Sequence, residues 1–172
     1  MPPSERLVAS LNEQVARELA AAHQYVAIGA HYDSETFPQL AKFFYEQADE
    51  ERDHAMRIVN YLLESGGRLN LGQVDAPSSA FDDHVAPIEL ALEQERANTV
   101  AIGKLFDIAR ETRDHASEVF LQWFVEEQVE EEAAIESLLQ VAERVRDFPM
   151  MLEEFVARDG ENLGAARGPS VG

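Results

Sequence analysis

Four glutamates stand at positions where a helical repeat would place apolar residues: Glu18, Glu51, Glu95 and Glu131. Each interrupts a series of apolar residues spaced three and four apart, the spacing of one face of an α-helix. His54 follows Glu51 by three residues and therefore shares its face. Buried together, these carboxylates would take up protons unless cations neutralised them, and two divalent ions balance four negative charges. Carboxylates with one imidazole favour iron or manganese, so the pattern predicts a two-metal site with Glu51 as its bridging ligand.

Helices are the elements that must position these residues, because helix-forming residues dominate and strand signals are scarce. The segment Thr36-Phe-Pro-Gln39 resembles a capping box, Gly66 and Gly67 form a helix stop, and Asp114 is a predicted N-cap. These signals predict an all-α chain with four long helices and a short fifth helix, over about 5–32, 36–65, 87–112, 114–146 and 148–158.

The connections between the predicted helices set the topology. Short turns follow the first and third helices, which gives two antiparallel hairpins, and residues 66–86 form a long loop that can run back along the whole bundle. The prediction is an up-down-down-up four-helix bundle with one long crossover. Counted from the two turns, all four glutamates lie at a similar height of roughly 25 Å, so their carboxylates should meet in one layer.

The composition limits the function classes. The 172 residues hold 14 Lys and Arg against 33 Asp and Glu, which gives a formal charge of −19, and they contain no cysteine. Disulfides, iron–sulfur clusters and thiolate zinc sites are thus excluded, and the acidity argues against nucleic acid and anionic membranes as partners. Without a signal peptide or a membrane-spanning run, we expect a cytoplasmic protein with a domain over 1–159 and a flexible tail over 160–172.

Two segments carry a family resemblance. Glu51-Arg-Asp-His54 and the run from Phe120 to Glu132, together with Glu18 and Glu95, resemble the non-haem prokaryotic ferritins over about residues 5–158. The resemblance implies a ferritin-like fold and ferroxidase activity. In that family Fe(II) is oxidised to Fe(III) by O2 or H2O2, and the ferric mineral is stored in a hollow homo-oligomeric shell of twenty-four subunits.

The resemblance also implies a ligand set for two iron ions per subunit. Glu18, Glu51 and His54 would hold the first ion, and Glu51, Glu95 and Glu131 the second.

Further residues match positions around the family's iron centre. Gln128 would stand beside the second ion, and Tyr25 matches a tyrosine next to the centre, although a simple core role for this tyrosine stays open. A possible third iron site, sharing Glu131, is implied at Glu50, Glu127 and Glu130. The same acidic run would also suit an ordinary solvated helix face.

Two departures separate this chain from related families. Arg52 occupies the position where bacterioferritins have a haem-ligating methionine, so no haem is expected. A second Glu-x-x-His motif is replaced by Gln128-Val-Glu-Glu131, which favours ferritin over bacterioferritin. Two alternatives remain: a di-iron peroxidase or oxidase without a storage role, and a non-catalytic helical assembly whose core glutamates are protonated.

Overall fold

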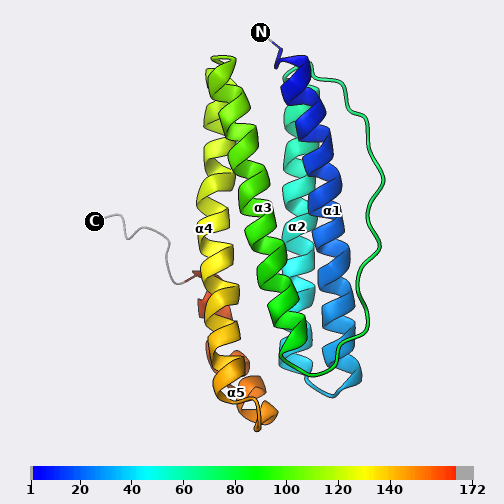
Figure 1. Ribbon diagram of the computed structural model, residues 1–172, viewed down its shortest axis with the longest axis vertical. Helices are drawn as coiled ribbons and strands as arrows, with labels where there is room; N and C mark the ends of the chain where they lie inside the picture. Colours follow the sequence, from blue (N-terminus) through cyan, green and yellow to red (C-terminus); the bar gives the residue numbers. More distant parts are fainter. Residues whose placement is uncertain (1, 166–172) are drawn as a thin grey trace, which may run out of the picture.

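The computed structural model describes residues 2–165, which form five α-helices (Figure 1). Four long helices lie side by side, and the shorter fifth helix packs against the second and the fourth. The helices are α1 (Glu5–Ser34), α2 (Pro38–Glu64), α3 (Ala86–Glu111), α4 (His115–Arg144) and α5 (Pro149–Ala165). Across residues 2–165, no helix combines the length and apolar character needed to span a membrane.

The chain order of the helices confirms the predicted topology. Helices α1 and α2 form one antiparallel hairpin, α3 and α4 form the other, and the crossover between α2 and α3 runs along α1 for most of the length of the bundle (Figure 1). Two buried amides hold this crossover. Asn12 donates to the backbone oxygen of Arg68 at 2.9 Å, and Gln24 donates to that of Ser78 at 2.8 Å.

Several helix ends follow the predicted signals. The Asp114 side chain accepts a hydrogen bond from the Ser117 backbone amide at 3.1 Å and so caps α4. At the end of α2, Gly66 has a φ of 78°, and the Gly67 amide donates to the Leu62 oxygen at 2.8 Å. This arrangement is the left-handed helix stop that glycine permits most readily.

The predicted capping box at the start of α2 is wrong. Thr36 has a φ of 68° and belongs to the preceding turn, and Phe37 occupies the N-cap position without a side-chain cap. The missing acceptor comes from α5 instead: the buried carboxylate of Glu153 accepts hydrogen bonds from the amides of Gln39 at 2.6 Å and Leu40 at 3.0 Å. A residue distant in sequence therefore satisfies this helix end, which no local motif announces.

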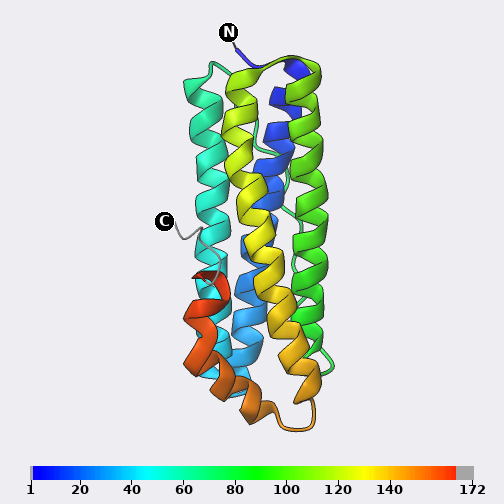
Figure 2. The ribbon, with the colours of Figure 1, turned by 90° about the vertical axis from the view of Figure 1, so that its left-hand side faces the viewer.

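Helix α5 is longer than the sequence indicates. The expected end near residue 158 falls inside it, because Gly160 keeps a helical backbone and the helix continues to Ala165. Packing against α2 and α4 supports this extension, and Figure 2 shows α5 turned back along the lower half of α2. Residues 160–165 thus belong to the helix, and the remainder of the expected flexible tail, 166–172, lies outside the described residues.

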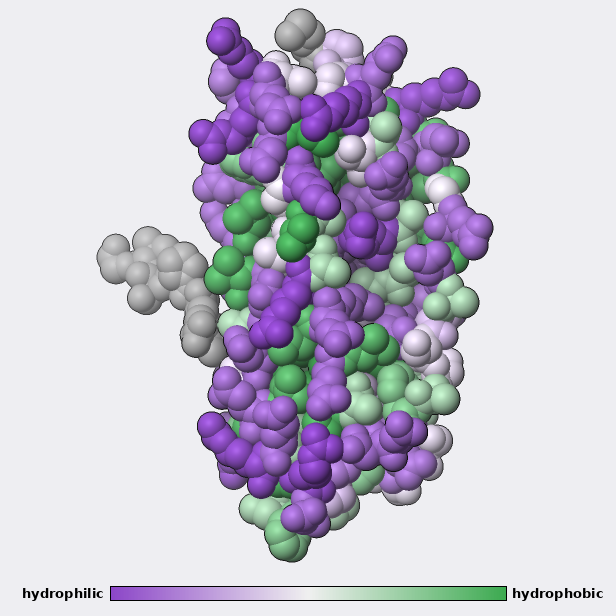
Figure 3. Space-filling model, viewed as in Figure 1, coloured by the Kyte–Doolittle hydropathy of each residue, from purple (hydrophilic) through white to green (hydrophobic). Residues whose placement is uncertain are grey.

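The hydrophobic core consists of two clusters with a polar layer between them. One cluster lies toward the α1–α2 turn and includes Tyr25, Tyr32 and Phe44. The other lies toward the chain's N-terminus and includes Leu11 and Ile58. On each long helix, the glutamate that interrupts the apolar series falls between residues of the two clusters. The face shown in Figure 3 carries mostly hydrophilic residues, whereas the four glutamates of the polar layer are buried.

Candidate metal centre

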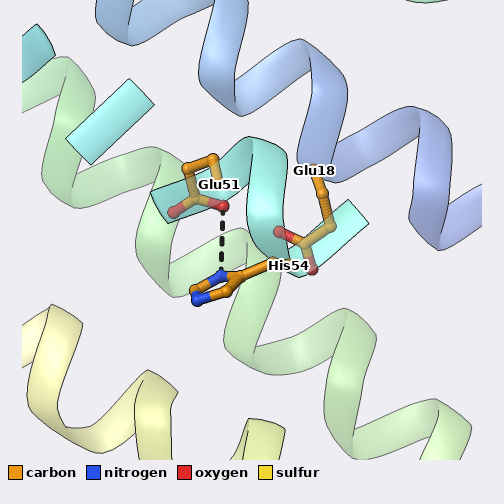
Figure 4. Close-up of side chains that lie close together, drawn as sticks. All are labelled: Glu18, Glu51 and His54. Atoms are coloured by element: carbon orange, nitrogen blue, oxygen red, sulfur yellow. Dashed lines mark ion pairs between the residues drawn. The ribbon is translucent and has the colours of Figure 1, made fainter. Parts of the chain in front are cut away.

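The four predicted glutamates meet in the polar layer. Glu18, Glu51, Glu95 and Glu131 come from four different helices, and their exposed fractions are 0%, 1%, 1% and 8%. His54 is 6% exposed, and Figure 4 shows it close to Glu51 on α2, with the Glu18 carboxylate of α1 directed toward the same space. The matched heights inferred from the sequence thus correspond to one buried layer.

Two groups of three side chains could each hold one metal ion. Glu18, Glu51 and His54 offer ligand atoms within 4.8 Å of one another, and Glu51, Glu95 and Glu131 do the same. Glu51 belongs to both groups, which places it where a ligand shared by two neighbouring ions would stand.

Buried polar atoms at this site lack partners within the described chain. Glu51 Oε2, His54 Nδ1 and Glu131 Oε2 are buried without a hydrogen bond to any residue from 2 to 165. His54 Nδ1 lies 3.6 Å from Glu51 Oε2 and 3.6 Å from Glu131 Oε1, too far for a good hydrogen bond. Unsatisfied buried groups are costly, and oxygen and imidazole lone pairs directed at one space are the donor set for a hard or borderline cation.

Burial controls the protonation of the metal-free layer. Desolvation is the main cause that raises the pKa of Glu51 and of Glu131 well above the usual range, and neighbouring carboxylates add to it. Desolvation also raises the pKa of Glu95 to about 7 and lowers that of His54. An entering cation would therefore displace protons from these carboxyl groups, and the lowered pKa of His54 favours the neutral imidazole that binds metals.

Tyr25 and Gln128 both contact Glu95. The Tyr25 hydroxyl donates a hydrogen bond to Glu95 Oε1, and its fully buried ring lies 5.7 Å from that of Phe44, so this residue also serves the core. The Gln128 amide nitrogen lies 3.2 Å from Glu95 Oε2. Gln128 therefore lies beside Glu95, a predicted ligand of the second ion.

Sequence reasoning missed two buried amides in the same layer. Gln14 and Asn98 are 2% and 3% exposed, and both lie within hydrogen-bond distance of Glu18. Their spacing was the available signal, because Gln14 precedes Glu18 by one helical turn and Asn98 follows Glu95 by nearly one turn.

The residues of the predicted third site line one cleft without forming one ligand group. Glu50, Glu127 and Glu130 border a cleft of about 580 Å³ between α2, α4 and the end of α5. The group whose ligand atoms lie within 4.8 Å of one another there is His54, Glu127 and Glu131. Glu50 instead accepts a hydrogen bond from Gln47 at 2.7 Å.

Comparison with known proteins agrees with this architecture. A family model for the ferritin-like domain matches residues 8–145. The chain is 44% identical over 166 residues to ferritin BfrB of Mycobacterium tuberculosis, covering 96% of this chain and 92% of the relative. The chain belongs to the ferritin family. It is also 38% identical over 144 residues to a bacterial non-heme ferritin of Staphylococcus aureus, covering 84% of this chain and 87% of that one.

A solved structure extends the relationship to the whole fold. This ferritin superposes on an open pore ferritin from Archaeoglobus fulgidus with a TM-score of 0.86 at 31% identity, covering 94% of this chain and 96% of that one. The resemblance to prokaryotic ferritins and the ferritin-like fold are thereby confirmed. Membership of the family supports iron storage as the general function of the chain.

Proposed function

We propose that this ferritin binds two ferrous ions in each subunit, oxidises them with O2 or H2O2, and stores the ferric product inside a hollow shell of twenty-four copies. The observation that carries the proposal is the pair of buried ligand groups that share Glu51. Each ferrous ion gives up one electron. Two electrons reduce one O2 to H2O2, or one H2O2 to water, so a paired site avoids release of a one-electron oxygen product.

The residues of this chain supply binding, charge balance and proton release. Four buried carboxylates balance two divalent ions, and the same set accommodates two ferric ions when an oxide shared by the ions completes the charge. Glu51, Glu95 and Glu131 give up the protons that burial keeps on them when ferrous iron enters. The chain's formal charge of −19 favours the approach of cations.

A third iron position is part of the proposal. Glu127 offers a carboxylate close to His54 and Glu131, and Glu50 and Glu130 border the same cleft. This placement supports a neighbouring site through which ferric product leaves the buried pair.

The proposed ferroxidase activity can be tested by removing Glu51, the shared ligand, together with His54. In the Glu51→Ala and His54→Ala double variant, we expect aerobic iron oxidation, followed by ferric absorbance, to fall to the rate of iron without protein. Replacement of the exposed Asn60 and Glu64 by alanine on the same helix is the matched control and should leave the rate unchanged. Rapid oxidation by the double variant, with its helical content intact, would contradict the ferroxidase assignment.

Storage has a separate measurement. After aerobic loading, ferric iron should elute with protein in one particle of about twenty-four times the 19.2 kDa chain mass. A monomer or dimer that oxidises iron without retaining it would favour the di-iron oxidase alternative.

A further inference from the structure

Three buried amide side chains connect the ligands of the two proposed iron positions. Gln14 of α1, Asn98 of α3 and Gln128 of α4 are 2%, 3% and 2% exposed, and they lie between Glu18 and Glu95. Amides at this depth must be hydrogen-bonded to be tolerated, so their partners reveal what they hold.

The first two amides converge on Glu18. The Gln14 amide nitrogen donates to Glu18 Oε1 at 2.6 Å and to Asn98 Oδ1 at 2.5 Å. The Asn98 amide nitrogen lies 3.3 Å from Glu18 Oε2 and 3.4 Å from Glu18 Oε1. Glu18 is therefore held from its own helix and from α3.

The second link continues from Asn98 to the other carboxylate. The Asn98 amide nitrogen also donates to Gln128 Oε1 at 3.2 Å. Gln128 in turn donates from its amide nitrogen to Glu95 Oε2 at 3.2 Å. The Gln128 amide nitrogen also lies 3.3 Å from the Glu95 backbone oxygen and 3.3 Å from the Thr99 hydroxyl, so this amide is held on α3 at more than one point. Each amide nitrogen therefore donates and each amide oxygen named here accepts, which fixes one orientation for each amide.

Neutral donors suit this task better than cations. A lysine or arginine at these positions would neutralise Glu18 and compete with an entering ion, whereas an amide orients the carboxylate and leaves its charge available. Asn98 also lines a cleft of about 640 Å³ beneath the crossover, and Gln14 lines a groove of about 400 Å³ between α1 and α3. Both amides thus fill the wall between Glu18 and the outer face.

We propose that Asn98 is a positioning residue that couples the two metal positions, because it holds Glu18 directly and Glu95 through Gln128. Gln14 also donates to Asn98, but Glu18 is the one proposed metal ligand to which it donates. This inference rests on the proposed function, which supplies the two metal positions. Gln14 and Asn98 lie in contact, yet their replacement should have different effects. Loss of Gln14 should weaken metal binding at the first position, and loss of Asn98 should weaken binding at both.

The test measures metal binding without oxidation. Apo-protein is titrated anaerobically with Fe(II) by calorimetry, and with Co(II) by visible absorption, which reports ligand geometry. We expect Gln14→Met to weaken one of the two binding steps by roughly tenfold and Asn98→Leu to weaken both by a similar factor. Asn98→Ala is a second variant, in case the larger leucine disturbs packing, and should also weaken both steps.

Asn12→Leu is the matched control. Asn12 is a buried amide on α1, two residues before Gln14, and it binds the crossover backbone at Arg68 and Asn70. Its loss should lower the melting temperature of the apo-protein and leave both binding steps and the rise in melting temperature on metal addition unchanged. The Gln14 and Asn98 variants should show the opposite pattern, with a reduced metal-induced rise.

Two results would overturn the coupling role. Either both Asn98 variants bind two ions as tightly as the unmodified protein, or they weaken only the step that Gln14→Met weakens. Absence of any two-ion binding by the unmodified protein is a different result, because it would overturn the proposed function itself and the inference with it.

Discussion

Replacement of Glu95 by glutamine should stabilise the metal-free protein and weaken its metal binding. Glu95 is 1% exposed, and desolvation raises its pKa from 4.5 to about 7. One pH unit of pKa displacement corresponds to about 1.4 kcal/mol, so ionised Glu95 costs the folded apo-protein about 3 kcal/mol at pH 8. At pH 5 the group is protonated in the folded protein and the cost falls below about 1 kcal/mol.

Glutamine keeps the shape of the side chain and one acceptor oxygen, which can take over the hydrogen bond from either Tyr25 or Gln128. The Glu95→Gln apo-protein should therefore melt about 6–12 °C above the unmodified apo-protein at pH 8, and only slightly above it at pH 5. Differential scanning calorimetry at both pH values measures this difference. Anaerobic calorimetry should show one tightly bound ferrous ion per subunit where the unmodified protein binds two.

Glu93→Gln is the control for this prediction, because Glu93 is exposed on the same helix two residues away. It should change neither the melting temperature nor the metal stoichiometry. Equal melting temperatures of Glu95→Gln and unmodified apo-protein at pH 8, or an equal gain at both pH values, would refute the reasoning that the buried charge of Glu95 destabilises the apo-protein.

Three further predictions concern pH, Tyr25 and Glu153. Because burial raises the pKa of Glu51, Glu95 and Glu131, their contribution to apo-protein stability is present below the unfolded value of 4.5 and is lost as pH rises through the folded values, so the melting temperature should fall between pH 5 and 8. His54, whose pKa is lowered from 6.5, changes stability in the opposite direction, but it is one group and the glutamates are three. A melting temperature that rises from pH 5 to pH 8 would contradict this prediction. Tyr25→Phe removes a hydrogen bond that lowers the pKa of Glu95, so Co(II) binding followed by absorption should require a higher pH; an unchanged midpoint would show that the bond does not act on Glu95. Glu153→Ala removes the cap of α2 and should lower the free energy of unfolding, measured by chemical denaturation, by about 1–2 kcal/mol. Glu154 is exposed, so Glu154→Ala is the control and should leave the free energy of unfolding unchanged.

Local signals predicted most of the fold. The stop at Gly66 and the cap at Asp114 act on residues within a few positions of themselves, so both can be recognised without knowledge of the tertiary structure. The cap of α2 could not be recognised in this way, since its acceptor is Glu153, more than a hundred residues away. Similarly, glycine commonly ends helices, but Gly160 lies inside α5, and Leu163 beyond it packs against the apolar cluster near the α1–α2 turn.

In the candidate site, too, some residues could be predicted from local sequence signals and others depend on tertiary packing. Glutamates in an apolar series are conspicuous because burial of a charge demands an explanation, and all four occupy the predicted layer. Gln14 and Asn98 were missed because an isolated polar amide on a long helix is unremarkable in sequence. Their importance depends on which partners they reach across the bundle, and that is a property of the packed helices.

The polar layer also has a consequence for where the helix bundle opens locally. Each half of the bundle has its own apolar cluster, and the two halves meet at a waist of acids and amides. Buried polar atoms without a hydrogen-bond partner lie in this polar layer, so in the apo-protein we expect backbone amides around residues 18 and 95 to exchange with deuterium sooner than those beside the two apolar clusters. Two bound metal ions would connect side chains from all four long helices. Slower amide exchange around residues 18 and 95 after metal addition would therefore report metal binding.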